Sequence, residues 1–267
     1  MTSILKTTHQ ACRRGLIALG ARRILVTYRN LEVTEQDIML ASYPKSGNTW
    51  LRALIASALS LSFASFEDLS ACVPELEFLR QVSSYKLPSG GRIIKTHESW
   101  CSKYRSAIYL VRDVRSVAVS YFFHLKRVSQ FNGNFDKFID LFVNGKLDGY
   151  GDWSAHVNSW CESPLGACDQ LLVVRYEDFL CAPIDNLAMI MHFLGIYVDH
   201  KVLERSVKNN SLQGMRKIER HSHIDHHDGL DFVRNTNTNS WSDFIDNGHE
   251  ELLKYKMGRE MIKFGYL

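Results

Sequence analysis

Short apolar runs alternate along the chain with longer segments in which apolar residues recur at helical spacing. The runs are mostly apolar throughout and rich in branched residues, which is typical of strands in a sheet covered on both faces. They predict strands over residues 37–43, 91–97, 106–112 and 170–176. A sheet built from such runs is expected to be parallel.

Helical patterns follow the first, third and fourth of these runs, over residues 48–61, 113–128 and 182–194. The order of strand, tight turn and helix presents the first turn of a helix to a ligand at the end of the strand. We therefore expect an α/β fold, a single three-layer domain with a mainly parallel sheet flanked by helices.

Two other segments have patterns of their own. Residues 1–36 contain six basic residues and no acid before Glu32, and they predict a basic helical segment packed on a domain of residues 37–267. Residues 215–240 are rich in His, Asp and Asn and poor in apolar periodicity, which predicts a loop or lid. Helical patterning then resumes at Asp243.

The composition is that of a globular protein, with 45% hydrophobic and 23% charged residues. The net charge of +3 argues against a general nucleic-acid binder and permits a local anion site. No long apolar run and no cleavable leader is recognisable, so we expect no membrane span and a cytoplasmic location. The six cysteines include no CxxC pair and are expected to be reduced. Nothing in the pattern indicates an oligomeric state.

The turn between the first strand and the first helix has the sequence YPKSGNTW. Gly47 permits a tight backbone with converging N–H groups, and Lys45 adds a mobile positive charge. Short side-chain donors stand where the helix dipole favours an anion, at Ser46, Asn48 and Thr49. The turn predicts a phosphate cradle. Because it lacks the Walker order of Gly, Lys and Ser or Thr, a ligand without a metal is expected.

A second cluster, YLVRDVRSVAVSYFFH over residues 109–124, repeats the same architecture. An apolar strand ends in Arg112, and Ser120 follows eight residues later on the predicted helix. An arginine at a strand end and a helix hydroxyl predict a second bound anion.

These segments together resemble the cytosolic-type sulfotransferases, which use 3′-phosphoadenosine 5′-phosphosulfate (PAPS). Further blocks of the resemblance are KTH at residues 95–97, YGDWSAHVNSW at residues 150–160 and RYEDFL at residues 175–180. The five blocks stand in the family's order and cover most of residues 37–267. The resemblance implies a P-loop-NTPase-like fold and transfer of a sulfuryl group from PAPS to a small-molecule acceptor, with 3′,5′-ADP as product.

The resemblance also implies the catalytic residues. His97 takes the place of the general base, because a largely neutral imidazole can accept a proton at pH 7. Lys45 is expected to stabilise the oxygen between phosphorus and sulfur as the bond breaks, with Lys95 and Thr49 in support. Ser120 is implied to contact both the 3′-phosphate and Lys45.

The cofactor-binding residues that the resemblance implies are Lys45, Ser46, Gly47, Asn48, Thr49, Trp50, Arg112, Ser120, Tyr176, Ser211, Leu212, Arg234 and Asn235. Trp50 and Tyr176 are implied to bracket the adenine, whereas Leu212 stands where the family usually has Phe. Asn235 and Thr236 replace the family's Lys and Gly, which removes one charged phosphate contact.

The acceptor site is less clearly marked. Resemblance implies that His156 faces the acceptor, and Tyr150 and Trp153 are neighbouring candidates. Acidic residues within 215–240 favour a polar or cationic acceptor, sulfated on a hydroxyl or an amino or amide nitrogen. A guanidinium natural product of the saxitoxin type is one candidate.

Histidines within residues 215–240 have spacings that can ligate zinc, at His221, His223, His226 and His227. Because acidic residues surround them, a solvated loop is the better interpretation, and no metal is predicted. Two alternatives to the sulfotransferase hypothesis stay open at this point. One is a magnesium-dependent nucleotide kinase or NTPase with an aberrant phosphate loop, and the other is a non-catalytic nucleotide-binding module.

Overall fold

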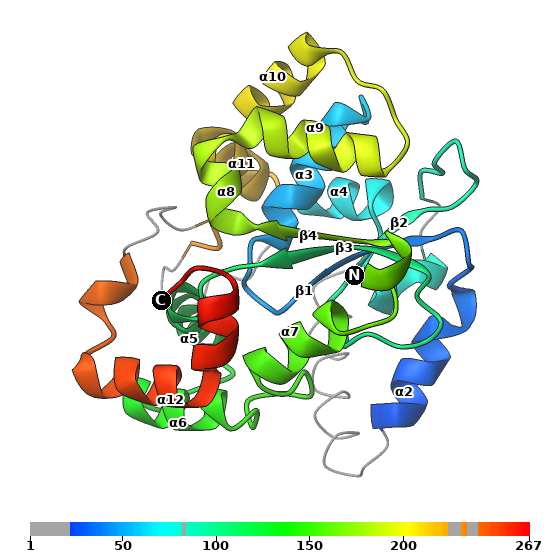
Figure 1. The fold of residues 1–267 in the computed structure, drawn as a ribbon. Helices are drawn as coiled ribbons and strands as arrows, with labels where there is room; N and C mark the ends of the chain where they lie inside the picture. The colour runs from blue at the N-terminus through cyan, green and yellow to red at the C-terminus, as the bar shows by residue number, and fades with distance from the viewer. Residues whose placement is uncertain (1–21, 82–83, 224–230, 234–239) are drawn as a thin grey trace.

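The structure is a computed structural model that describes residues 22–81, 84–223, 231–233 and 240–267 (Figure 1). Its described residues form a parallel sheet of four strands in the order β2-β1-β3-β4. The strands are β1 (Ile38–Ser42), β2 (Ile93–Thr96), β3 (Ser106–Val111) and β4 (Leu171–Arg175). Each lies within a predicted run, and the predicted parallel pairing is confirmed.

Helices cover both faces of the sheet because successive strand residues point to opposite sides. Met39 lies in one apolar cluster and Leu40 in the other. The Leu40 face is covered by α3 (Asn48–Ala58), α4 (Phe66–Cys72), α8 (Tyr176–Cys181), α9 (Pro183–Phe193), α10 (His200–Asn209) and α11 (Leu212–Arg220). The Met39 face is covered by α5 (Val114–Arg127), α6 (Phe135–Val143), α7 (Trp153–Cys161) and α12 (Asn247–Lys263). The two sets lie on opposite sides of the sheet in Figure 1 and confirm the three-layer prediction.

The helices predicted after β1 and β3 each begin one residue after an N-cap residue. Gly47 stands at the N-cap of α3, and Asp113 caps α5 by accepting a hydrogen bond from the Arg115 N–H. Helix α3 ends at Ala58, three residues before the predicted end, and Ser60 then adopts a left-handed conformation with φ of 59°.

The predicted loop or lid over residues 215–240 is wrong for its first part. Helix α11 runs to Arg220, with Ser211 at its N-cap and Met215 and Ile218 buried. Too few apolar residues mark that buried face for the pattern to reveal it. After residue 240 the chain forms a short 3₁₀ helix, η5 (Ser240–Asp243), and then α12.

Helix α2 (Arg22–Arg29) precedes the first strand and continues into η1 (Asn30–Glu32). It packs near the 3₁₀ helix η2 (Leu76–Gln81). Arg29 is buried and lies 3.6 Å from Glu77 and 3.3 Å from Glu98, measured between the nearest nitrogen and oxygen atoms.

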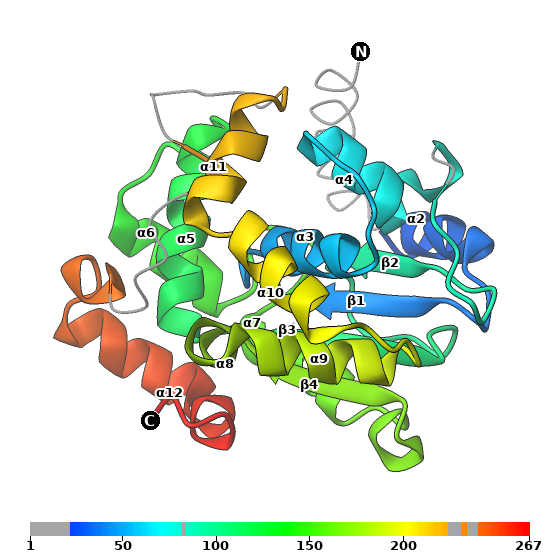
Figure 2. The same ribbon diagram turned by 90° about the horizontal axis from the view of Figure 1, so that it is seen from above.

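No helix in the described part of the chain is long and apolar enough to cross a membrane. The five described cysteines are free thiols. From above, α9 and α10 lie over the sheet while α5, α6 and α12 form a separate group (Figure 2).

Candidate functional site

The carboxyl ends of the four strands meet at one edge of the sheet, and each is followed by a predicted site residue. His97 comes directly after β2, Arg112 after β3 and Tyr176 after β4. Lys45 lies in the turn after β1. Ligands of open parallel sheets bind at this edge, and the arrangement gathers residues that are far apart along the chain.

The turn after β1 has the tight backbone that the sequence predicts. Lys45 and Gly47 adopt left-handed conformations with φ of 70° and 100°. A side-chain carbon on Gly47 would stand 2.5 Å from the Tyr176 ring, so only glycine fits there. Arg112 donates a hydrogen bond of 3.2 Å from Nη1 to the Lys45 carbonyl, which ties the turn to the end of β3.

Asn48 is not a side-chain donor to a ligand, in contrast to the prediction. Its Nδ2 atom donates to the Leu40 carbonyl and to Ser42 Oγ, both at 3.1 Å. Both hydrogens of the amide are used in anchoring the turn to β1, so Asn48 can offer an anion only its backbone N–H. The Ser46 hydroxyl is buried, without a hydrogen-bond partner among the described residues, and Thr49 is half-buried.

The two predicted adenine-binding aromatics lie together. The ring centroids of Trp50 and Tyr176 are 5.5 Å apart with planes at 68°, an edge-to-face contact and not two parallel plates. Trp50 Nε1 donates to the Asn210 carbonyl at 2.8 Å, which brings the Ser211 and Leu212 turn next to Trp50. Four predicted cofactor residues from distant segments therefore gather at one place.

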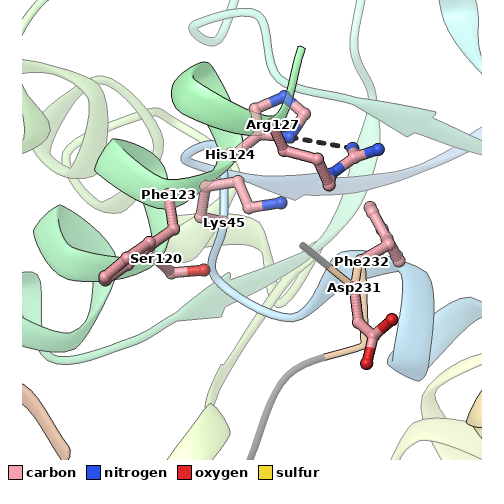
Figure 3. Close-up of a pocket in the computed structure, with 7 residues that line it drawn as sticks. All are labelled: Lys45, Ser120, Phe123, His124, Arg127, Asp231 and Phe232. Atoms are coloured by element: carbon pink, nitrogen blue, oxygen red, sulfur yellow. Dashed lines mark hydrogen bonds between the residues drawn. The ribbon is translucent and has the colours of Figure 1, made fainter. Parts of the chain in front are cut away.

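Lys45 and Ser120 line one polar cleft, as their expected contact with a common ligand requires (Figure 3). The prediction missed the other residues of this cleft, which are Phe123, His124, Arg127, Asp231 and Phe232. A signal was present in the sequence, because Ser120, His124 and Arg127 recur at helical spacing on one face of α5.

The His97 ring is held in one tautomer by the backbone at the end of β1. Its Nδ1 atom lies 2.7 Å from the Ser42 carbonyl, so this nitrogen carries the proton and Nε2 is left unprotonated. Burial lowers the pKa of His97 well below its ordinary value, and the nearby Lys95 charge adds to the effect. The imidazole is therefore neutral at pH 7 and can accept a proton.

Lys95 was expected to support Lys45 at the ligand, but its ammonium is held by a carboxylate. Its Nζ lies 2.9 Å from Glu75 Oε2, and Arg52 lies 3.1 Å from the other oxygen of that carboxylate. The lysine is buried in this cluster, so its described effect on the site is electrostatic, through His97.

His156 is fully buried, which corrects the prediction that it faces the acceptor. Its Nδ1 is 2.9 Å from the Tyr109 hydroxyl, and its Nε2 is 3.0 Å from the His97 carbonyl. Both ring nitrogens are occupied, so His156 fixes the backbone of His97 and does not contact a substrate.

The two other acceptor candidates differ from each other. Trp153 is fully buried among core side chains, which contradicts its predicted contact with an acceptor. Tyr150 lies beside His97, with ring centroids 5.8 Å apart, and its hydroxyl donates to Glu77 at 3.4 Å. Tyr150 therefore adjoins His97, and its contact with an acceptor stays a prediction.

Several predicted residues lie outside the described residues: Arg234, Asn235, Thr236, His226 and His227. Glu219, one of the acids taken as a sign of a polar acceptor, is buried and accepts from the backbone N–H groups of Phe232 and Val233. The described residues contain no group of three or more metal-ligating side chains, and the expectation of a metal-free site stays a prediction.

A neutral imidazole, a lysine and an arginine thus stand together at the carboxyl edge of a parallel sheet, where α/β proteins bind ligands. Residues 35–265 match the sulfotransferase domain family, and the chain belongs to that family. It is 27% identical to mouse sulfotransferase 1B1, over 97% of this chain and 94% of the relative. It is 26% identical to sulfotransferase 1A1 of Bos taurus, over 87% and 85% of the two chains.

Solved structures share the fold. Mouse sulfotransferase SULT7A1 complexed with PAP has a TM-score of 0.69 at 23% identity, covering 91% of this chain and 92% of the other. Retinol dehydratase in a complex with retinol and PAP has a TM-score of 0.69 at 20% identity, covering 90% and 86%. These likenesses confirm the predicted α/β sulfotransferase fold.

The family assignment confirms the predicted resemblance and the predicted enzyme class, and it replaces the NTPase and non-catalytic alternatives. Sulfotransferases use PAPS as donor, in agreement with the predicted cofactor. The saxitoxin-type acceptor finds no support among the relatives, and the burial of Glu219 weakens its only motive.

Proposed function

We propose that this chain transfers the sulfuryl group of PAPS to a hydroxyl group of a small acceptor, with His97 as the general base. An amino nitrogen is the other acceptor atom compatible with the site. The observation that carries the proposal is the position of His97. Its neutral imidazole stands at the end of β2, beside the strand whose following turn carries Lys45.

The residues present fit the anionic donor. Gly47 leaves space that a side chain would fill, and Lys45, Arg112 and Ser120 supply a donor set suited to phosphate and sulfate oxygens. When bound, PAPS supplies the sulfuryl group and a phosphate that can leave with the bond's electrons. Lys45 would neutralise charge that develops on that phosphate, because an ammonium is a mobile point charge.

His97 accepts the proton of the acceptor hydroxyl in this proposal. The Ser42 carbonyl holds the Nδ1 hydrogen, and His156 holds the His97 carbonyl, so the ring is fixed with Nε2 as the acceptor. Nε2 takes the proton of the acceptor hydroxyl while the new oxygen–sulfur bond forms and the sulfur–oxygen bond to the phosphate breaks. Tyr150 packs edge-to-face beside the ring.

His97→Gln tests this role. Its kcat is expected to fall by about 10²–10⁴-fold, as for a lost general base. Its affinity for 3′,5′-ADP is expected to stay near that of the wild type, because the imidazole faces the acceptor. Transfer from radiolabelled PAPS and calorimetry on the same preparation measure the two quantities.

His200→Gln is the matched control, because His200 is exposed on α10, outside the site. It is expected to keep both activity and binding. A His97→Gln enzyme that retains more than about a tenth of the wild-type kcat would show that His97 is structural.

The relatives include retinol dehydratase, solved with retinol and with androsterone. By analogy we propose a small alcohol or phenol as the acceptor class. A cytoplasmic location also belongs to this proposal.

A further inference from the structure

The ends of β3 and β4 are joined by one carboxylate. Glu177, the second residue of α8, lies directly after Tyr176, and its Oε1 atom accepts the backbone N–H of Asp113 at 3.1 Å. Asp113 lies directly after Arg112 and is the N-cap residue of α5, the helix that carries Ser120. Glu177 therefore links the segments that carry three predicted donor-binding residues.

The side chains beside this link are stacked. The guanidinium carbon of Arg112 lies 4.2 Å from the centre of the Tyr176 ring, which is a cation–π contact. Arg112 also donates to the Lys45 carbonyl at 3.2 Å. The Tyr176 ring in turn packs against Gly47, where an added side-chain carbon would stand 2.5 Å from it. A shift between the ends of β3 and β4 would therefore separate the stack and disturb the turn after β1.

The other oxygen of the Glu177 carboxylate is held by Tyr266. The chain after α12 returns toward α5 and α8 (Figure 1), and there the Tyr266 hydroxyl donates to Glu177 Oε2 at 3.0 Å. Burial raises the pKa of Tyr266, and the Glu177 charge adds to the shift, so the phenol keeps its proton at pH 7. Both carboxylate oxygens of Glu177 therefore have a donor of fixed identity.

Tyr266 is itself held on several sides. It is only 8% exposed, and its carbonyl accepts a hydrogen bond from Arg115 Nη2 at 2.7 Å. The guanidinium carbon of Arg175 lies 4.9 Å from the centre of its ring. A buried side chain packed in this way occupies one orientation, so its hydroxyl fixes the direction of the Glu177 carboxylate.

We propose that Glu177 and Tyr266 are positioning residues for the donor nucleotide. Their hydrogen bonds hold the ends of β3 and β4 at a fixed separation, and this separation keeps Arg112 stacked on Tyr176. The inference deepens the proposed function and rests on it. The competing role, a contribution of the two residues to folding stability alone, is an outcome of the test.

The test measures the Kd of 3′,5′-ADP by calorimetry. Tyr266→Phe removes only the hydroxyl that holds Glu177, and its Kd is expected to rise at least about 5-fold, the lower end for coupling between separate sites. Glu177→Ala removes both contacts and is expected to weaken binding at least as much. Glu177→Gln is expected to bind more tightly than Glu177→Ala, because an amide can accept from the Asp113 N–H and donate to the phenol oxygen.

A double variant shows whether the two residues act through one contact. Once Glu177→Ala has removed the carboxylate, the Tyr266 hydroxyl has nothing left to hold, so adding Tyr266→Phe is expected to leave the Kd unchanged. Tyr255→Phe is the matched control. It is the same substitution on α12 at a residue that is 85% exposed, and it is expected to bind 3′,5′-ADP as the wild type does.

Two results would overturn the proposal. One is a Tyr266→Phe protein that binds 3′,5′-ADP as tightly as the wild type, even if urea unfolding shows it to be less stable, because the contact would then serve stability alone. The other is a double variant in which the two single effects on Kd multiply. Failure of the proposed function looks different, because the wild type itself would then not bind 3′,5′-ADP, and this inference would fall with it.

Discussion

Gly47 is the residue on which the shape of the phosphate turn depends. Gly47→Ala is expected to be destabilising for two reasons. A left-handed conformation costs a residue with a side chain about 1–2 kcal/mol. The new methyl group would also stand 2.5 Å from Tyr176, and overpacking adds about 1–3 kcal/mol. Urea unfolding measures the sum, and a weaker 3′,5′-ADP complex is expected from the displaced Tyr176 ring.

Gly195→Ala separates the two contributions. Gly195 also has a positive φ, 70°, but nothing lies within 4 Å of an added side-chain carbon. It is expected to show the conformational cost alone and normal binding of 3′,5′-ADP. Equal destabilisation in the two variants would mean that the Tyr176 ring moves away from the methyl group, so that the close contact adds no cost.

The two half-buried histidines of the site make stability depend on pH. Burial lowers the pKa values of His97 and His124 in the folded state, whereas both titrate near 6.5 in the unfolded chain. Below pH 6.5 the unfolded state therefore binds more protons. Their contribution to stability is present above pH 6.5 and is lost as the pH falls toward the folded pKa, by up to about 1.4 kcal/mol per pH unit for each histidine.

His124→Gln measures one of these contributions. The variant is expected to have a smaller slope of unfolding free energy against pH between pH 5 and 6.5, determined by urea titration. Phe122→Leu, a change of a non-titrating residue on the same helix, is expected to keep the wild-type slope. An unchanged slope in His124→Gln would show that His124 titrates alike in the folded and unfolded states.

At the scale of elements, Arg115 joins helix α5 by hydrogen bonds to α12 and to Tyr266. Its guanidinium donates to Asp113 at 2.8 Å, to Glu250 of α12 at 3.0 Å and to the Tyr266 carbonyl at 2.7 Å. Arg115→Met would leave the buried Asp113 carboxylate without its cation. We expect a loss of about 3–5 kcal/mol, measured by urea unfolding.

Arg105→Met is the comparison for that change. Arg105 pairs with Glu35 at 3.3 Å, but the two side chains are 60% and 81% exposed. Solvent screens such a pair, so the expected loss is about 0–1 kcal/mol. If both arginine variants lost the same stability, the network around Arg115 would contribute nothing beyond an exposed ion pair.

The sequence predicts the strands and the turn after β1 because these depend on local patterns. An apolar run flanked by turn residues can be recognised in any sequence. A glycine such as Gly47 indicates a left-handed backbone conformation at its own position. The contacts that polar side chains make depend on residues far away in the sequence. Asn48, Lys95 and His156 were each predicted to face a ligand, and each is bound by a backbone or side chain that no spacing rule identifies.

For the whole molecule, Arg29 links the N-terminal part of the described chain to the surroundings of His97. Its guanidinium stands between Glu77 and Glu98, with all three side chains less than 10% exposed. Arg29→Met is expected to loosen α2 and to speed chymotrypsin cleavage at Tyr28. Each 1.4 kcal/mol lost raises the opened population about tenfold.

Arg105→Met is the control, because Arg105 pairs with Glu35 at the surface, where the side chains are 60% and 81% exposed. It is expected to change the cleavage rate little. Comparable rates in the two variants would mean that α2 is held by its apolar contacts and not by Arg29.

The meeting of four strand ends also has a consequence for the order of folding. Arg112 and the Lys45 carbonyl that it binds are 67 positions apart, and β1 pairs with β2 on one side and β3 on the other. Contacts between such distant segments form slowly, because the intervening chain must first lose its freedom. A nascent chain that ends before β4 still lacks Tyr176, the ring against which Gly47 packs. A chain that ends before β4 is therefore expected to lack a complete nucleotide site, and the Ser211 and Leu212 turn beside Trp50 is added later still.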